Sequence, residues 1–284
     1  MRDRRSRLAD RAAAALAWSA ALSVAGVFAW IVGDLLRHGM GEIGFSFFIE
    51  APRDFGRAGG IAPILVSTAL ILFVCMSVSL PLGLGAAALL AEFGSTDPRL
   101  ARWVRRSLDV LAGVPSIVFG LFGYAFFCIA LGMGYSILAG GLTLACMVLP
   151  LLIRATEEGF RAVPDEIRLG AAALGMSRSR TLFSLLLPAA APGLIVGFAL
   201  GVGRALAETA ALLYTSGYVD RMPGSPMHSG RSLSIHVYDL AMNVPGGEAR
   251  AYASAVALVG LLLAINLASS AIAGRRLRRG FVAA

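Results

Sequence analysis

The chain has 284 residues, of which 57% are hydrophobic and 15% are charged, and its mean hydropathy is +0.76. These values exclude an ordinary soluble domain and predict an all-α polytopic membrane protein. The formal net charge is +8, but all 25 basic residues are arginines that gather in loops and tails, so we expect no nucleic-acid partner.

Six apolar segments are predicted to cross a bilayer, since one crossing needs about 20 apolar residues. In chain order they cover about residues 13–36, 61–92, 108–132, 135–153, 189–215 and 251–273. The second is longer than one crossing needs, so we expect it to tilt, protrude or kink at Pro81. A cleaved signal peptide is the alternative for the first segment, but its apolar part exceeds the about 7–15 residues of a signal core. We therefore expect a permanent span.

The arginines predict the orientation, because positive residues favour the cytoplasmic side. Seventeen lie in the N-terminal tail, the loop after the second span, the loop after the fourth span and the C-terminal tail, whereas six lie on the opposite side. Both tails, residues 1–12 and 275–284, are therefore expected in the cytoplasm. Residues 13–274 are expected to form one six-helix transmembrane domain with a long cytoplasmic loop at 154–188.

That loop carries a helix–glycine–helix pattern. Pro164 suits the first turn of a helix, Gly175 suits a left-handed cap at its end, and Ser177 suits the N-cap of a second short helix. We expect such an ordered hairpin to dock into a groove on a cytoplasmic partner. The alternative is an amphipathic loop that rests on the membrane surface.

Arg204 and Glu208 are the only charges between residues 181 and 219. A charge in hydrocarbon costs at least a few kcal/mol, so such residues usually face the protein interior and mark a transport path. At i and i+4 of a continuous helix the two side chains can reach each other. Arg154 and Glu157 form a second candidate pair at the inner end of the fourth span. For that pair, interfacial snorkelling is an equally good interpretation.

Three glycines repeat every four residues in the fifth span, at Gly193, Gly197 and Gly201. Small residues at this spacing let helix backbones approach closely in a membrane. We expect a helix-packing ridge, with tight packing and no further role as the simplest interpretation.

No enzymatic site is predicted. A chain without lysine cannot contain the Gly-Lys-Ser/Thr of a nucleotide-binding loop. The three cysteines lie singly in apolar segments without metal-ligand spacing, and no nucleophile–base arrangement stands out. We expect no catalytic residue, no metal site and no cofactor in this chain, so energy for transport must come from another polypeptide.

The loop at 154–188 resembles the coupling loop of bacterial ABC-importer permeases, in which Glu-Ala-Ala, a glycine and a later Leu-Pro recur at fixed spacing. Alignment on Gly175 and residues 187–188 places residues 169–171 at the Glu-Ala-Ala position, without the acidic residue. The resemblance implies the type I, MetI-like permease fold. It also implies docking to an ATPase through Leu169, Gly170, Ala171, Leu174, Gly175 and Ser177.

Three further strings narrow the resemblance. They are GVPSIVFG at residues 113–120, GRALAETAALLYTSG at 203–217, and PM with LSIHVY at 226–227 and 233–238. Together they resemble the permease subunits of phosphate ABC importers, the PstA type more closely than the sister PstC type. In that family, positions similar to Arg154 and Glu157 are associated with transport. The resemblance implies a subunit of the bacterial inner membrane with four kinds of partner: a PstC-like permease, a PstB-like ATPase dimer that holds ATP and magnesium, a periplasmic PstS-like binding protein, and phosphate.

The expected mechanism is alternating access driven by the partner ATPase. We interpret Arg204 and Glu208 as a gate, in which the arginine is paired when the path is closed and released toward phosphate when it opens. One alternative is a permease for another oxyanion, such as phosphonate, sulfate or molybdate. A second, from a different class, is an ion-coupled secondary carrier in which Glu208 titrates.

Overall fold

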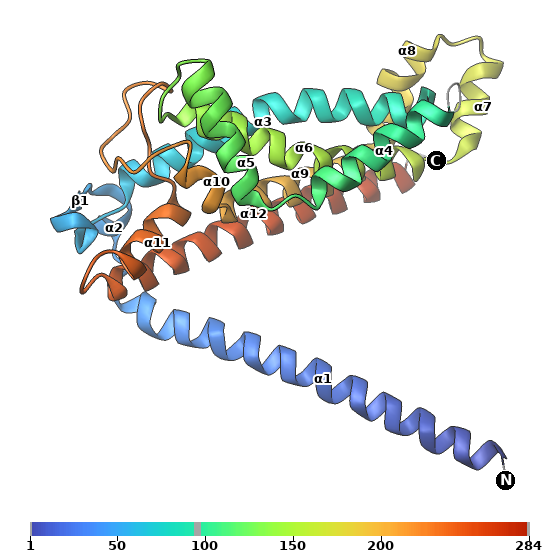
Figure 1. Ribbon diagram of the computed structural model, residues 1–284. Coiled ribbons are helices and arrows are strands. Elements are labelled where there is room, and N and C mark those ends of the chain that lie inside the picture. The colour runs from blue at the N-terminus through green and yellow to red at the C-terminus, as the bar shows by residue number, and fades with distance from the viewer. Residues whose placement is uncertain (1, 94–97, 283–284) are drawn as a thin grey trace.

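The computed structural model describes residues 2–93 and 98–282, and it is almost entirely helical (Figure 1). Met1 and residues 283–284, the ends of the two expected tails, lie outside the described residues. Five helices are long and apolar enough to cross a membrane: Ala13–Glu42, Ala62–Glu92, Ile137–Arg161, Arg178–Ala207 and Glu248–Arg275. A bent pair of helices, Pro98–Ala112 and Ser116–Ala130, passes the same test jointly, which gives up to six crossings.

The first helix, α1 (Arg2–Gly39), leaves the body of the protein at an angle and touches it mainly at its C-terminal end (Figure 1). There Gly39 lies against Tyr252 and Val256, and the Tyr252 hydroxyl donates to the Asp34 carboxylate at 3.2 Å. Between Ala13 and Glu42 none of the most apolar window is buried inside this chain. Its apolar surface is therefore available to lipid or to another subunit.

A short, mostly irregular region follows at the same end of the molecule. It contains a turn of 3-10 helix (Met40–Glu42), α2 (Phe45–Ile49) and a two-stranded antiparallel hairpin, β1 (Pro52–Arg53) and β2 (Ala58–Gly59), in which Pro52 pairs with Gly59. A second 3-10 turn, Asp54–Gly56, closes the hairpin. Helix α3 (Ala62–Ala88) starts with proline in its first turn and runs to the opposite end, where a π-helical segment, Leu89–Phe93, extends it.

The third predicted span is not one helix. Helix α4 (Pro98–Ala112) and helix α5 (Ser116–Gly123), which a π-helical segment extends through Tyr124–Ala130, meet at an angle of 96°. The bend lies at residues 113–115, where Pro115 has an extended backbone and disfavours helix in the residue before it. The GVPS string therefore marks a sharp corner, and the expected helix over 108–132 is corrected to two segments.

Seven more helices complete the described part of the chain. Helix α6 (Ile137–Arg161) begins at the Ser136 cap and runs eight residues beyond the expected end of the fourth span. Two short helices follow, α7 (Asp165–Ala173) and α8 (Arg178–Thr181). Through a π-helical segment, Leu182–Leu186, α8 continues directly into α9 (Leu187–Ala207). After α10 (Ala210–Leu213) and α11 (Leu233–Met242), helix α12 (Glu248–Val282) returns to the end that carries α7 and α8 (Figure 1).

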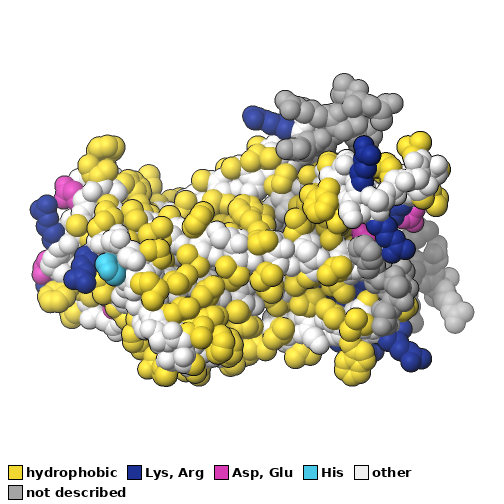
Figure 2. Space-filling model, turned by 90° about the horizontal axis from the view of Figure 1, so that it is seen from above, with side chains coloured by type: hydrophobic (Ala, Val, Ile, Leu, Met, Phe, Trp, Pro, Cys, Tyr) yellow, Lys and Arg dark blue, Asp and Glu magenta, His cyan; other side chains and the backbone are white. Residues whose placement is uncertain are grey.

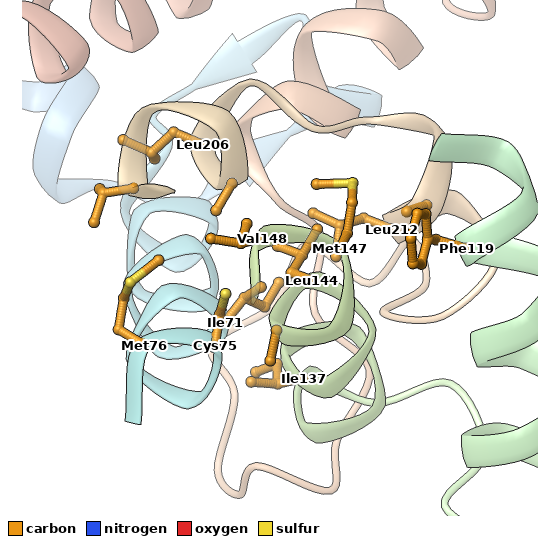
Figure 3. Close-up of a cluster of buried hydrophobic side chains, with 14 of the residues drawn as sticks. Ile71, Cys75, Met76, Phe119, Ile137, Leu144, Met147, Val148, Leu206 and Leu212 are labelled. Atoms are coloured by element: carbon orange, nitrogen blue, oxygen red, sulfur yellow. The ribbon is translucent and has the colours of Figure 1, made fainter. Parts of the chain in front are cut away.

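The main core lies where α3, α6, α9, α10 and α5 meet. Ile71 and Cys75 of α3, Leu144 and Val148 of α6, and Leu206 of α9 point toward one another there (Figure 3). On the outside, apolar side chains cover the middle of the molecule and charged side chains gather at its two ends (Figure 2). This distribution is that of a protein whose middle faces hydrocarbon and whose ends face water.

Candidate functional site

The fifth span presents one uncovered face. Val196, Leu200, Arg204 and Ala207 are all exposed, and their spacing places them on one side of α9. The rest of the helix packs against α6, α12 and α3. In the described part of the chain, Arg204 has neither an ion-pair partner nor a hydrogen-bond acceptor for its guanidinium group.

The depth of Arg204 follows from the glycine ridge. A Cβ added to Gly193 would lie 2.7 Å from the Cα of Gly159, and one added to Gly201 would lie 3.0 Å from the Cγ1 of Val148. Val148 is the twelfth of the 25 residues of α6. Arg204 is one turn further along α9, about 5 Å beyond Gly201. It therefore lies beside the N-terminal half of α6 and in the last turn of α9.

Glu208 does not continue the helix of Arg204. Helix α9 ends at Ala207, and Glu208 is extended, with φ −77° and ψ 126°. Its Oε1 accepts a hydrogen bond from the backbone N of Ala211 at 3.2 Å, which caps α10. The expected contact at i and i+4 on one continuous helix is therefore absent from this structure, because the helix breaks between the two residues.

Arg154 and Glu157 lie on one helix, α6, but each has a different partner. The Arg154 Nη2 pairs with the Oδ1 of Asp109 on α4 and also donates to the Arg105 carbonyl at 3.2 Å. The Glu157 side chain is only 4% exposed; its Oε1 accepts a hydrogen bond from Arg105 at 2.7 Å and lies 2.9 Å from the Nη2 of Arg161 in a second ion pair. The expected pair between these two residues is thus replaced by two ion pairs that fasten α4 to α6.

The segment between α6 and α9 forms the helix–glycine–helix hairpin. Gly175 adopts a left-handed conformation with φ 67°, and the Ser177 Oγ accepts from the backbone N of Arg180 at 3.4 Å. Leu169, Gly170 and Leu174 are exposed at the end of the molecule, the last by 81%. Ala171 is instead buried and packs inward.

An ion pair fixes this hairpin to the bundle. Arg168 Nη2 lies 2.8 Å from the Oε1 of Glu92, at the end of α3, and the same guanidinium donates to the carbonyls of Val163 and Phe160. The pair raises the pKa of Arg168 above its ordinary value, mainly through the hydrogen bond to Glu92. Helix α7 is therefore attached to α3 and α6 by one side chain.

Sequence reasoning missed the residues that hold these charges. No sequence pattern assigned a role in a site to Arg105, Asp109, Arg168 or Glu92. The only signal was a charge close to the end of an apolar segment, which does not say which distant residue will face it. Their partners lie 45 to 76 residues away along the chain.

At the other end of the molecule, a buried polar cluster links α11 to the loop before it. Arg231 Nη1 lies 3.1 Å from the Oδ2 of Asp239 and 3.4 Å from the Nδ1 of His236, while its Nε donates to the Tyr218 carbonyl at 2.9 Å. Burial, aided by the Arg231 charge, lowers the pKa of His236 to about 3. His236 is therefore neutral and serves as a packing group.

The His, Cys, Asp and Glu side chains of the described residues are dispersed. Within residues 2–93 and 98–282 no three His, Cys, Asp or Glu side chains gather as metal ligands would, and Cys75, Cys128 and Cys146 are free thiols. The arrangement offers a guanidinium without a partner among the described residues, in the last turn of α9, and an exposed hairpin at one end.

Comparison with known proteins agrees with these features. Residues 79–279 match the family described as "Binding-protein-dependent transport system inner membrane component". The chain is 30% identical to the "Probable ABC transporter permease protein YqgI" of Bacillus subtilis, over 93% of this chain and 94% of that protein. It is 35% identical to the "Phosphate transport system permease protein PstA 1" of Mycobacterium tuberculosis, over 78% of this chain and 71% of that protein.

Solved structures show the same fold. The inward-facing MetNI methionine ABC transporter matches with a TM-score of 0.58 at 19% identity, over 76% of this chain and 94% of that chain. An amino acid ABC transporter matches with a TM-score of 0.51 at 17% identity, over 77% of this chain and 92% of that chain. The chain therefore belongs to the family of binding-protein-dependent transport system inner membrane components, the membrane-spanning permeases of ABC importers, which leave ATP hydrolysis to a separate subunit.

Proposed function

We propose that this chain is the PstA-type permease subunit of an ATP-driven phosphate importer. The observation that carries the proposal is Arg204, an arginine without a partner in the described part of the chain, on the uncovered face of α9 and in the last turn of a helix long and apolar enough to cross a membrane. Relatives named phosphate transport system permease PstA, among them that of Xylella fastidiosa at 32% identity over 75% of this chain, support phosphate as the cargo.

The uncovered face of α9 carries Arg204, so contact of this face with lipid hydrocarbon is unfavourable. A guanidinium at the centre of a bilayer costs at least about 2.5–3.5 kcal/mol on insertion scales, so such residues face other protein or a water-filled cavity. Arg204 belongs to a helix long and apolar enough to span the membrane, and apolar residues flank it on both sides along the chain. We therefore propose that this face lines the translocation path, and that a second, PstC-like permease closes the path from the other side.

The guanidinium of Arg204 is a suitable binding group for phosphate. Phosphate at neutral pH is an anion with several oxygens, and arginine binds such groups through paired, charge-assisted hydrogen bonds. Because Glu208 is held on α10, it does not neutralise Arg204 in this conformation. The proposed gate would use this difference: Arg204 is open to phosphate here, and pairs with Glu208 or with an acid of the second permease when the path closes.

The hairpin of α7 and α8 is the proposed docking site of the PstB-like ATPase dimer. Leu169, Gly170, Leu174, Gly175 and Ser177 form an exposed, partly apolar end, while buried Ala171 and the Arg168–Glu92 pair tie it to the bundle. Movement of the docked ATPase would therefore pass directly to α3 and α6. This assignment places both termini in the cytoplasm and a PstS-like binding protein at the end that carries β1, β2 and α11.

The ion pairs between α4 and α6 are proposed to support the path rather than to carry phosphate. Arg154 and Glu157 are both engaged, with Asp109 and with Arg105 and Arg161 respectively. Loss of either residue would loosen the joint between the bent third span and the bundle. We expect this to change transport through the geometry of the path.

Transport by the reconstituted four-component complex tests the proposal. Arg204→Gln should abolish uptake of labelled phosphate while leaving assembly intact, and Arg204→Lys should retain part of it because the charge remains. Arg221→Gln, at an exposed outer position, is the matched control and should transport normally. Normal uptake by Arg204→Gln at normal protein levels would refute the proposal that Arg204 lines the translocation path.

The cargo is tested separately. ATP hydrolysis by the wild-type complex should rise more with phosphate-loaded than with sulfate-loaded binding protein. Equal stimulation by sulfate would support a permease for another oxyanion. Transport without any ATPase subunit would support an ion-coupled carrier.

A further inference from the structure

The break between α9 and α10 exposes backbone groups within the membrane-spanning region. Glu208 is extended and Thr209 has φ −117° and ψ −50°, so the helical hydrogen-bond ladder is interrupted for two residues. Where no water is present, each unsatisfied backbone group costs several kcal/mol. Such a break persists only if other groups of the protein supply the missing partners.

One of these partners comes from a distant helix. The Ser234 hydroxyl, in the first turn of α11, donates a 2.6 Å hydrogen bond to the backbone carbonyl of Glu208. Glu208 satisfies the next segment in turn, because its carboxylate accepts from the backbone N of Ala211. The residue at the break is therefore held at two points, and Ser234 holds the main chain.

The position of Ser234 is itself rigidly defined. Ser234 is 5% exposed, and its Oγ lies 2.9 Å from the Oγ of Ser232, which caps α11. The backbone N of Leu233 donates to the Thr68 Oγ1 on α3 at 2.9 Å. The hydroxyl that holds the break is thus anchored to α3 and to the start of α11, not to a flexible loop.

Closure of the break would have an electrostatic consequence. If helix α9 continued through residue 208, Arg204 and Glu208 would stand at i and i+4 on one face and could pair. A paired arginine attracts an anion much less strongly than a free one. A contact that holds Glu208 outside the helix therefore leaves the positive charge of Arg204 free to attract an anion.

We propose that Ser234 is a positioning residue for transport: its hydrogen bond to the Glu208 carbonyl holds the α9–α10 break open and so keeps Glu208 from neutralising Arg204. The inference rests on the proposed function, in which Arg204 faces the transported anion. Ser234 touches neither the anion nor Arg204. It acts through Glu208.

The test measures phosphate transported per ATP hydrolysed in proteoliposomes that contain the complete transporter and loaded binding protein. Ser234→Ala should lower this ratio about tenfold, the effect of losing one hydrogen bond to a buried carbonyl, while ATP hydrolysis stays close to normal. Ser234→Thr keeps a hydroxyl and should retain the ratio. Ser216→Ala is the matched control, because it removes a buried serine hydroxyl that bonds within its own turn, to the Leu212 carbonyl, away from the break.

The double variant Ser234→Ala with Glu208→Gln gives the decisive readout. Glutamine can still accept from Ala211 but cannot neutralise Arg204, so the double variant should have the same ratio as Glu208→Gln alone. A general loss of stability would lower transport and ATP hydrolysis together, would affect Ser234→Thr equally, and would add to the effect of Glu208→Gln. Any of these results would overturn the inference.

The two proposals fail in different ways. If Arg204→Gln transports phosphate normally, the proposal that Arg204 lines the translocation path is wrong. If Arg204→Gln blocks transport but Ser234→Ala transports a normal amount of phosphate per ATP, the proposed path is supported and the proposed role of Ser234 is wrong.

Discussion

The Nε of Arg105 on α4 donates to the Oε1 of Glu157 on α6 at 2.7 Å, and this bond joins the bent third span to the centre of the bundle. The Glu157 carboxylate also forms an ion pair with Arg161, one turn further along α6. Two guanidinium groups thus converge on one buried carboxylate. Breaking such a group is costly because it leaves buried charge without compensation.

Glu157→Gln should therefore destabilise the permease by about 3 kcal/mol, the lower end of the range for a broken buried pair. The adjacent Glu158→Gln is the control, since Glu158 is exposed and should change stability by less than about 0.5 kcal/mol. Thermal unfolding of the two purified variants in detergent makes the comparison. Equal midpoints would show that the Arg105–Glu157 pair contributes little.

The ridge of α9 predicts a steric effect that depends on position. Gly193→Ala should be strongly destabilising, because the new Cβ would lie 2.7 Å from the Cα of Gly159 and only a shift of backbone could relieve it. Overpacking of this kind typically costs about 1–3 kcal/mol. Gly203→Ala on the same helix meets nothing nearer than 3.9 Å and should be tolerated. Detergent stability and the yield of assembled transporter are the measurements, and tolerance of both changes would contradict the close approach.

We expect the contacts of Arg168 to affect the coupling of ATP hydrolysis to transport. Arg168→Ala removes the Glu92 pair and two hydrogen bonds to carbonyls, so helix α7 should lose about 2 kcal/mol of its attachment to α3 and α6. The partner ATPase should then copurify less well, or hydrolyse ATP without transport. Arg106→Ala, which removes an exposed arginine of α4, should leave the ATPase attached and coupled. Full retention and coupling in Arg168→Ala would exclude the anchoring role.

Because His236 is buried and neutral, we expect the free energy of unfolding to depend on pH. Burial lowers its pKa to about 3 from an ordinary value of 6.5, so the unfolded chain takes up a proton below pH 6.5 that the folded chain refuses. Stability should therefore fall as the pH drops from 6.5 toward 3, by up to about 1.4 kcal/mol per pH unit from this group.

Replacement of His236 by Gln should make the unfolding midpoint less sensitive to acid between pH 6.5 and 4.5. His228→Gln changes an exposed histidine and should leave the acid dependence of the wild-type chain intact. Identical slopes for His236→Gln and wild type would mean that His236 is accessible to protons in the folded protein.

The sequence by itself determined the features that depend on local chemistry. Apolar length predicts membrane-spanning helices, and the glycine at position 175 and the serine at 177 predict the turn and cap that the structure has, because both depend on the conformational range or side-chain reach of one residue. The glycine spacing of α9 likewise predicts a face of close backbone contact. The family resemblance rested on such short strings.

Only the tertiary structure decided where the charges find their partners and where the helices break. Arg154 binds Asp109, Glu157 binds Arg105, and Arg168 binds Glu92, all across distances in sequence that no periodic pattern encodes. Nothing in the string from Arg204 to Glu208 marks a break, since alanine and leucine favour a continuous helix. At that break Ser234, 26 residues later, is folded back to donate to the Glu208 carbonyl, a contact that no local pattern encodes, and Arg204 has no partner in the described part of the chain.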